Sequence, residues 1–414
     1  IDFTDMLVFV WRAIEESAPW AKDLQGRYDY VALDEAQDAN LIQIRILDHV
    51  AANAKCALWI GDARQSLYSF RGARLDLFRD RAAAWTLLPL RYNYRSDGEI
   101  IRVANSFASG HDWHIGGDAI TPSARAVTPT AVVISKDAVP CAEIAVAVAD
   151  GASPSNFAVL CRTNSGLASY EAGLALAQIP FYSTAGKGGA WATKDGRALL
   201  AYLRAAGDTA TIDELVSIAN RPVRKLSRSV IEDACGAVKG PVRNVIDRLS
   251  RTNHPCAKAL QDDLLTLAAL EWPARCTMVA SLLVTDLKQR ATTDIDPDAD
   301  RIKLVEALAT IAAARGSLAE LESLVKAAEA AQRDAKRGGQ TRPKVTLSTV
   351  HKAKGLEWQT VYVDTANMPH EKSTDVGEEA RLFFVAITRP MSRMIVLCAD
   401  PEKHPFVAKI VAKG

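Results

Sequence analysis

The stretch YVALDEAQDAN, residues 30–40, places a short apolar run directly before two adjacent acids, Asp34 and Glu35. The run from Tyr30 to Leu33 is typical of a parallel strand that helices cover on both faces. The acids then fall at the carboxyl end of the strand, the edge where open α/β sheets bind ligands. Asp-Glu pairs are common on solvated surfaces, so the pair alone decides nothing. Hard oxygen ligands at this edge nevertheless suit a magnesium ion that carries nucleotide phosphates.

The length and composition of the chain indicate a soluble protein of two or three domains. Its 414 residues exceed one ordinary core, and 49% apolar with 24% charged residues is the composition of a globular protein. No apolar run is long enough to span a bilayer, and the acidic start IDFTDMLVFV is unlike a signal peptide, so we expect a cytoplasmic protein without a membrane partner. Scattered cysteines without a C-x-x-C pair indicate neither disulfides nor zinc. The net charge of +1 neither supports nor excludes nucleic acid binding.

Apolar periodicity predicts two α/β units. In the first, a helix over 5–16, a strand at 30–33, a helix over 40–52 and a strand at 56–60 are typical of half a doubly wound sheet. A loop rich in Gly, Asp, Thr and Pro follows at 111–129.

The second unit is interrupted by a helical segment. Its predicted strands lie at 131–134, 157–161, 345–348, 360–363 and 394–398, with helices over 141–150, 169–178 and 378–388. Between about 195 and 337, Ala- and Leu-rich helical patterns replace strand patterns. There Ser317 is a candidate cap for a helix whose core face carries Leu318, Leu321, Val325 and Ala328.

A second polar cluster follows the strand at 56–60, in the stretch WIGDARQSLYSFRGA at 59–73. Asp62 would share the sheet edge with Asp34 if the two strands are neighbours. Gln65 lies a turn further on, within reach of a phosphate or an attacking water. The residues Tyr68, Phe70 and Arg71 combine aromatic faces with a cation, which single-stranded bases stack upon. Taken alone, that cluster is explained more simply as a packed aromatic pair beside a surface arginine.

Three later stretches add further candidates. In LRYNYRS, 90–96, Tyr94 could lie against a nucleobase and Arg95 could clamp a phosphate through its planar guanidinium. The stretch VTLSTVHKAKGLEWQTVYV, 345–363, supplies His351, Lys352, Lys354, Gly355 and Glu357. The stretch EEARLFFVAITRP, 378–390, presents Arg381 and Arg389.

Taken in order, DEAQD, GDARQSLYSFRGA, NYRS, VHKAKGLEW and EEARLFFVAITRP resemble motifs two to six of the UvrD/Rep/PcrA family of superfamily-one DNA helicases. IDFTDML at the start and NFAVLCRTNSGLASYEAGLALAQIPF at 156–181 extend the resemblance over nearly the whole chain. The resemblance implies two RecA-like parallel-sheet cores and a helical insertion domain. The first core, with motifs two to four, would occupy 1–110; the second, with motifs five and six, 111–195 and 340–414; and the insertion 196–339.

The resemblance also implies catalytic roles, with ATP and Mg²⁺ as cofactors. Asp34 would hold Mg²⁺ and Glu35 would activate the attacking water. The γ-phosphate would be contacted by Gln65, Arg95 and Arg389, the arginines neutralising charge in the transition state. Arg389 matters most, because a cation from the second core that reaches a nucleotide on the first couples hydrolysis to domain closure.

Nucleotide and DNA contacts follow from the same resemblance. Tyr94 would stack on adenine, and Glu357, beside Gly355, would approach the ribose. Single-stranded DNA, or a single-strand/double-strand junction, would meet Tyr68, Phe70, Arg71, His351 and Lys352. Such a protein would be nucleoid-associated. Two positions depart from the family pattern: Pro390 replaces the usual Ala after the last arginine, and Phe70 replaces the more usual Trp.

One expected element has no counterpart in the sequence, because no G-x-x-x-x-G-K-[S/T] occurs in the chain. The nearest text, TAGKGGAW at 184–191, lacks the spacing and the hydroxyl. With the Ile start, this predicts the carboxyl-terminal part of a helicase whose first core is incomplete and whose phosphate loop lies upstream. We expect an intact 3′ to 5′ translocase on single-stranded DNA, and no ATP hydrolysis by this chain alone. The alternative is an inactive helicase-like module that binds DNA or a partner; the retained catalytic set favours the first interpretation.

Overall fold

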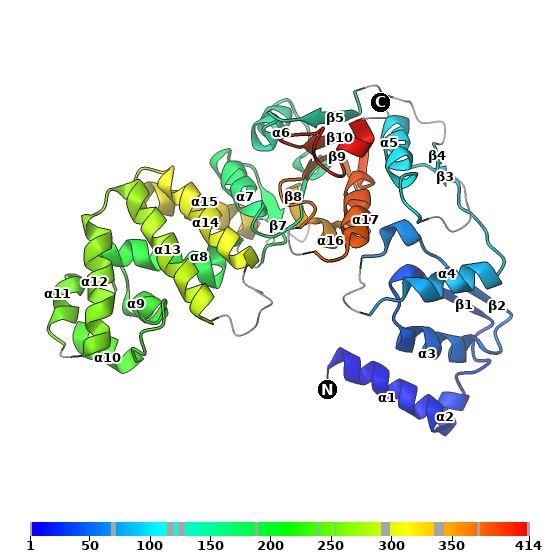
Figure 1. The fold of residues 1–414 in the computed structure, drawn as a ribbon, viewed down its shortest axis with the longest axis horizontal. Coiled ribbons are helices and arrows are strands. Elements are labelled where there is room, and N and C mark those ends of the chain that lie inside the picture. Colours follow the sequence, from blue (N-terminus) through cyan, green and yellow to red (C-terminus); the bar gives the residue numbers. More distant parts are fainter. Residues whose placement is uncertain are drawn as a thin grey trace.

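The computed structural model gives the chain three regions, which Figure 1 shows as an N-terminal unit, a six-stranded sheet with its helices and a helical region. It describes residues 2–67, 72–113, 120–122, 128, 130–186, 189–236, 238, 240–252, 254–290, 299–334, 343–370 and 373–411, without the side chains of 299 and 332–334. The parallel sheets and flanking helices confirm the predicted α/β class. Within those ranges, no helix has the length and apolar character needed to cross a lipid bilayer.

The N-terminal unit pairs two short parallel strands with helices and two single 3₁₀ turns. Its elements are α1 (Phe3–Glu15), α2 (Pro19–Lys22), β1 (Tyr30–Leu33), η1 (Ala36–Asp38), α3 (Leu41–Ala51), β2 (Cys56–Trp59), η2 (Ala63–Gln65) and α4 (Leu75–Ala84). Helix α1 starts earlier than predicted, because Asp2 and Asp5 form a capping box with 2.9 Å bonds in both directions. Asn40 and Gln43 cap α3 in the same way.

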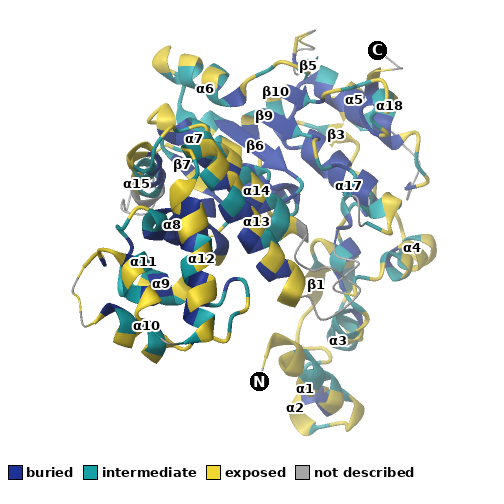
Figure 2. Cartoon of the chain, turned by 60° about the vertical axis from the view of Figure 1, so that its left-hand side comes forward, coloured by how far each residue is buried: buried dark blue, intermediate teal, exposed yellow. Residues whose placement is uncertain are grey.

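The expectation that β1 is a buried strand is wrong. Tyr30 is 73% exposed, and exposed and half-buried residues alternate along β1. On β2, Leu58 is also exposed. The physical reason is that successive side chains of a strand point to opposite faces, so the alternation means that the face of this two-stranded sheet that carries Tyr30 and Ala32 is not covered by packing within the described ranges. Figure 2 shows this contrast, with the N-terminal unit largely yellow and teal and the second sheet dark blue.

The second sheet has six parallel strands in the order β5-β10-β9-β6-β8-β7. The strands are β5 (Val132–Ser135), β6 (Phe157–Cys161), β7 (Phe181–Ser183), β8 (Val345–Thr349), β9 (Trp358–Asp364) and β10 (Pro390–Leu397). The helices on its faces are α5 (Gly98–Ala108), α6 (Pro140–Ala149), α7 (Leu167–Leu176), α16 (Val350–Ala353), α17 (Val376–Ile387) and α18 (Ala408–Val411). Further 3₁₀ turns are η4 (Pro154–Asn156) and η5 (Ala190–Ala192).

Strand β6 shows why both faces of this sheet are covered. Ala158 and Leu160 pack into the cluster formed with α5 and α17, whereas Phe157 and Val159 pack toward α6 and α7. This alternation is the period of two that a pleated strand imposes. Pro390 opens β10 after α17 has ended at Ile387, and a proline is tolerated at the first residue of a strand.

Helix α5 packs with the second sheet. Phe107 lies 5.0 Å from Phe383 of α17, measured between ring centroids, and Ile100 and Val103 are buried in the same cluster. The packing therefore joins 98–108 to the second sheet, although the sequence assigned them to the first core. The boundaries at 110 and 339 stay predictions, and the second lies outside the described residues.

A short strand pair has one of its strands, β4, in the segment 111–129 that the sequence predicted as a loop. Strands β3 (Tyr92–Asn93) and β4 (Thr121–Pro122) pair in parallel. The side-chain amide of Asn105 on α5 holds the backbone of Ile120, because its NH₂ group donates to the Ile120 oxygen and its carbonyl accepts from the Ile120 N–H. Strand β7 was also missed, although it completes one edge of the second sheet.

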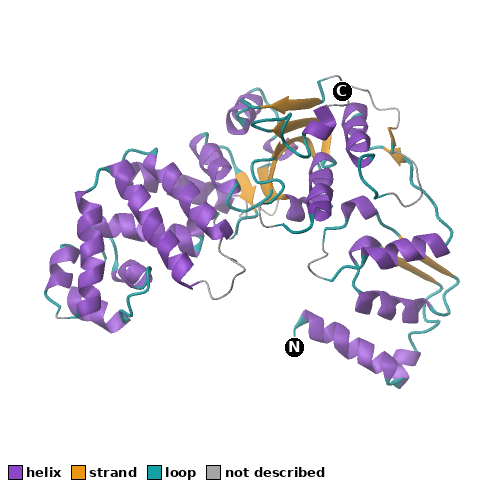
Figure 3. Ribbon diagram, viewed as in Figure 1, coloured by secondary structure: helices purple, strands orange, loops and turns teal. Residues whose placement is uncertain are grey.

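The helical region extends to the left of the orange strands in Figure 3. Its helices are α8 (Lys194–Ala206), α9 (Ile212–Ala219), α10 (Arg228–Cys235), α11 (Val245–Ser250), α12 (Pro255–Ala269), α13 (Trp272–Arg290), α14 (Ala299–Ala313) and α15 (Leu318–Asp334). Ser317 accepts a hydrogen bond from the Glu320 backbone, as its capping role predicts. Leu321 lies in the helical core and Ala328 in the sheet core, so α15 joins the two.

Candidate functional site

The predicted catalytic acids follow β1 at the sheet edge. The backbone N–H of Glu35 donates to Asp34 Oδ1 at 2.9 Å, and Glu35 has the left-handed φ of 52°. This turn points the chain into η1 and aims the Glu35 carboxylate back, so that Oε2 accepts from Gln37 Nε2 at 2.5 Å. Lys354 Nζ lies 3.3 Å from the same oxygen. Glu35 is therefore held by an amide and a cation.

Lys354 is the residue at this edge that the sequence analysis named as a candidate but assigned no role. Its side chain is 7% exposed and pairs with Asp38, while Nζ also donates to the backbone oxygen of Gln65 at 2.8 Å. Burial raises the pKa of Asp38, and the hydrogen bond from Lys354 opposes that rise. Lys354 thus joins the second core to two acids of the first. The sequence held no signal that separates it from Lys352, because its partner lies 316 positions away.

Gln65 bridges the two cores through its side-chain amide. Its Nε2 donates to Asp62 Oδ2 at 3.0 Å, and its Oε1 accepts from Arg389 Nη2 at 3.1 Å. Strands β1 and β2 are parallel neighbours, so Asp34 and Asp62 follow at the same edge of the sheet. The Asp62 backbone N–H donates to Gln37 Oε1 at 3.0 Å, which fixes the segment after β2 against η1.

Arg389 is a buried cation, 2% exposed, that follows α17. It donates from Nε to the Val385 oxygen at 3.0 Å and from Nη2 to Thr388 Oγ1 at 3.1 Å, besides its bond to Gln65. Burial, together with the nearby charge of Arg95, lowers the pKa of Arg389 to about 10. The side chain therefore stays charged at neutral pH. A buried arginine with one partner across the core boundary is poised to contact an anion there.

Arg95 and Glu357 form an ion pair with each other. The sequence assigned these residues to different parts of a nucleotide, a phosphate and the ribose, and here they meet directly. The backbone N–H of Arg95 is held by Asn93 Oδ1 at 2.8 Å. Beside them, Tyr94 is 72% exposed and offers an open ring face, and Gly355 has the left-handed φ of 79° at which a side chain is strained.

The predicted DNA-binding residues divide into described and undescribed ones. His351 is half-buried on α16, the short helix after β8, and burial, with the charge of Arg162, lowers its pKa to about 4. The imidazole is therefore neutral at pH 7. Lys352 is exposed and donates to the Thr184 backbone oxygen at 2.6 Å. The remaining candidates, Tyr68, Phe70 and Arg71, lie outside the described residues.

A Mg²⁺ ion fits Asp34 as a single carboxylate ligand. Asp34 is exposed at the strand end, and its Oδ1 accepts from the Glu35 backbone N–H. Among the described residues, no group of three or more His, Cys, Asp or Glu side chains could enclose a metal. One carboxylate with waters and substrate phosphates is the usual Mg²⁺ arrangement, so the donor set agrees with a nucleotide-borne ion.

The segment 62–67 docks on α17, a contact that the sequence did not predict. Arg381 of α17 donates from Nε to the Ser66 oxygen at 2.9 Å, and Leu67 is fully buried in the cluster of the second sheet. The guanidinium of Arg64 lies 5.3 Å from the ring centroid of Phe384. The segment 62–67 of the first unit is therefore packed against the second sheet.

Comparisons with known proteins agree with this arrangement. Residues 1–83 match the UvrD/REP helicase N-terminal domain, and residues 283–400 match the UvrD-like helicase C-terminal domain. ATP-dependent DNA helicase UvrD2 of Mycobacterium tuberculosis is 28% identical over 410 residues, which cover 94% of this chain and 50% of the relative. The putative ATP-dependent DNA helicase YjcD of Bacillus subtilis is 26% identical over 431 residues, covering 96% of this chain and 55% of the relative. The chain spans about half the length of these curated relatives.

Proposed function

Because this chain belongs to the UvrD-like helicases, we propose that the intact protein is an ATP-dependent motor that moves 3′ to 5′ along single-stranded DNA and unwinds duplexes at single-strand/double-strand junctions. ATP and Mg²⁺ are its cofactors. The direction of movement rests on the family resemblance.

One contact carries the proposal: the Arg389 guanidinium of the second core bonds to the Gln65 amide, which follows the strand next to the catalytic acids. A site assembled from two cores responds to any change in their contact. Hydrolysis and release at such a site would alternately tighten and loosen the cores. The same alternation, applied to a DNA strand lying across both, would move the protein along it.

The side chains have separate tasks in the proposed reaction. Asp34 holds Mg²⁺, and Glu35 takes the proton of the attacking water. Gln65 orients groups at the γ-phosphate, and Arg95 and Arg389 neutralise the negative charge that spreads over the transferred phosphoryl oxygens. ATP supplies the phosphoanhydride bond that is broken. For Arg95 to act, its ion pair with Glu357 must open.

The remaining proposed residues bind the nucleotide or the DNA and take no part in the chemical step. Tyr94 stacks on adenine, and Glu357 with Gly355 lies near the ribose. The DNA strand meets Tyr68, Phe70, Arg71, His351 and Lys352. Because His351 is neutral at pH 7, its contact to DNA is stacking or a neutral hydrogen bond rather than a charge pair with phosphate.

The chain by itself is proposed to turn over ATP at background rate. The 414-residue sequence contains no G-x-x-x-x-G-K-[S/T] motif, whose backbone amides and lysine cradle phosphates. We place that loop in a segment of the intact protein outside this chain.

The test is ATP turnover by the intact protein with and without single-stranded DNA, together with strand displacement from duplexes carrying a 3′ or a 5′ single-stranded tail. We expect DNA-stimulated turnover and displacement of the 3′-tailed duplex. Turnover that DNA does not stimulate, with retained DNA binding, would favour an inactive binding module instead. Displacement of only the 5′-tailed duplex would reverse the polarity.

A further inference from the structure

The carboxylate of Asp62 is saturated by N–H donors, most of them from Arg64. Its Oδ1 accepts from the Arg64 backbone at 3.0 Å and from Arg64 Nε at 2.8 Å. Its Oδ2 accepts from Arg64 Nη2 at 3.0 Å and from Gln65 Nε2 at 3.0 Å. The guanidinium grips both oxygens at once, the strong two-point geometry of arginine and carboxylate.

This grip determines which way the Gln65 amide faces. Asp62 can only accept hydrogen bonds and Arg389 can only donate them, so the NH₂ group of Gln65 must face Asp62 and its carbonyl must face Arg389. If the Asp62 carboxylate rotated away, nothing in these contacts would keep the amide in that orientation. The side chain that prevents the rotation is Arg64.

Arg64 also touches the second core. Its guanidinium lies 5.3 Å from the ring centroid of Phe384, a fully buried residue of α17. Arg389 follows the same helix five positions later. The contacts therefore close a loop, from Phe384 through Arg64, Asp62 and Gln65 back to Arg389.

We propose that Arg64 is a positioning residue for ATP hydrolysis: it clamps Asp62 and stacks on Phe384, and thereby fixes the Gln65 amide toward Arg389 when the two cores meet. This inference rests on the proposed function. Arg64 has no contact with the acids Asp34 and Glu35, so it acts through Gln65 rather than on the reacting atoms.

The chain contains a matched control for Arg64. Arg74 also pairs with a carboxylate two positions away, Asp76, but both side chains are about half exposed and lie away from Gln65. Arg64→Ala removes the clamp, and Arg64→Lys keeps the charge without the two-point grip. Arg74→Ala removes a similar local pair without touching the loop of contacts.

The first measurement uses this chain and needs no activity. The side-chain amide resonance of Gln65, assigned by its loss in Gln65→Leu, reports the bond to Asp62. In Arg64→Ala we expect the resonance to shift and its hydrogen exchange to quicken by about tenfold, as for the loss of a charge-assisted hydrogen bond. Arg64→Lys should fall between, and Arg74→Ala should match the wild type. An unchanged Gln65 amide in Arg64→Ala overturns the proposal.

The second measurement uses DNA-stimulated ATP turnover by the intact protein. Arg64→Ala should lower kcat by about tenfold or more, as for a displaced catalytic group, with KM for ATP within about twofold of the wild type. A raised KM at unchanged kcat would mean that Arg64 binds the nucleotide, which contradicts a positioning role. If the wild-type protein shows no DNA-stimulated turnover, the proposed function fails, whereas the amide measurement still decides the role of Arg64.

Discussion

Arg389 Nη2 donates to Gln65 Oε1 at 3.1 Å, although the two residues lie 324 positions apart in the chain. Gln65 follows the strand beside the acids of the first unit, and Arg389 lies between α17 and β10 of the second sheet. The contact brings a buried cation of one core to the strand-end edge of the other, where the predicted catalytic acids lie. The proposed coupling of ATP hydrolysis to movement depends on this contact.

Glu35→Gln should lower DNA-stimulated ATP turnover by the intact protein about 10²- to 10⁴-fold, because an amide cannot accept the proton of the attacking water. Nucleotide binding should persist, since Asp34 keeps its carboxylate. Steady-state turnover and fluorescent-nucleotide binding measure the two effects. Turnover within a few fold of the wild type would exclude Glu35 as the general base.

Lys354→Met should destabilise the contact between the two units by about 3 kcal/mol, because it leaves the partly buried Asp38 without its cation. Denaturant unfolding of this chain measures the loss. Without Lys354, the pKa of Asp38, already raised by burial, rises further, so the penalty should shrink as the pH falls and Asp38 takes up a proton. The control is Lys403→Met, whose exposed pair with Asp400 should not affect the unfolding midpoint. A pH-independent penalty would contradict this account.

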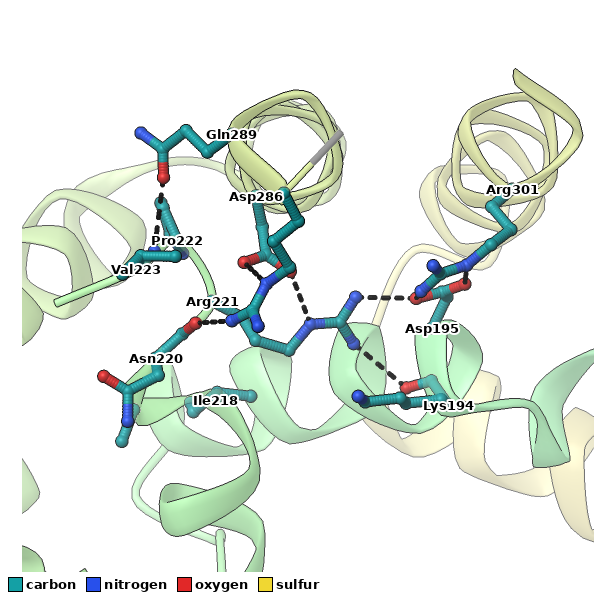
Figure 4. A network of polar contacts seen from close by, with 12 residues as sticks. Lys194, Asp195, Ile218, Asn220, Arg221, Pro222, Val223, Asp286, Gln289 and Arg301 are labelled. Atoms are coloured by element: carbon teal, nitrogen blue, oxygen red, sulfur yellow. Dashed lines mark hydrogen bonds and ion pairs between the residues drawn. The ribbon is translucent and has the colours of Figure 1, made fainter. Parts of the chain in front are cut away.

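Arg221→Met should lower the free energy of unfolding of the helical region by about 3–5 kcal/mol. Figure 4 shows Arg221 between two buried carboxylates, bonded to Asp195 Oδ1 at 2.6 Å and to Asp286 Oδ2 at 2.9 Å. Methionine keeps most of the volume but leaves both acids with one arginine fewer. Arg228→Met, which removes exposed ion pairs, is the control and should leave the unfolding midpoint unchanged. Equal effects of the two variants would mean that the buried network contributes no more than a surface pair.

The titration of His351 should make this chain less stable in mild acid. Burial, with the charge of Arg162 and against that of Glu379, lowers the folded-state pKa to about 4, while an unfolded histidine titrates near 6.5. Between these values the unfolded state binds more protons, so stability is lost as the pH falls from about 6.5 toward 4. His351→Gln should lose less stability than the wild type over this range in denaturant unfolding. Identical pH profiles would contradict the assigned pKa.

Local pattern was sufficient to predict most of the second sheet, because its strands are apolar on both faces and its helices carry clear periodicity. It failed where the outcome depends on distant partners. The residues of β1 predict a buried strand, yet its exposure is set by whether other elements cover each face of its sheet, which the local sequence does not encode. The strand pair β3 and β4 lies in a stretch without strand periodicity and is held by Asn105 of α5.

The same limit applies to the site. Asp34 and Glu35 stand at the end of β1 and Gln65 lies in the turn η2 that follows β2, so their positions mark them as candidates. The role of Lys354 could not be assigned in this way, because it depends on an ion pair with Asp38, which lies on the other core. The mutual pairing of Arg95 and Glu357 was likewise beyond the sequence, which gives each residue a charge but no distance to the other.

The central claim is that Arg389 completes an ATP site on the first core, and its most direct test is DNA-stimulated ATP turnover by the intact protein carrying Arg389→Ala. We expect turnover to fall by about 10³-fold or more, the range for an arginine that neutralises transition-state charge. Arg389→Lys should not restore it, because a lysine lacks the planar guanidinium. Arg393→Ala, at an exposed position on β10, should turn over ATP like the wild type. Wild-type turnover by Arg389→Ala would contradict the claim.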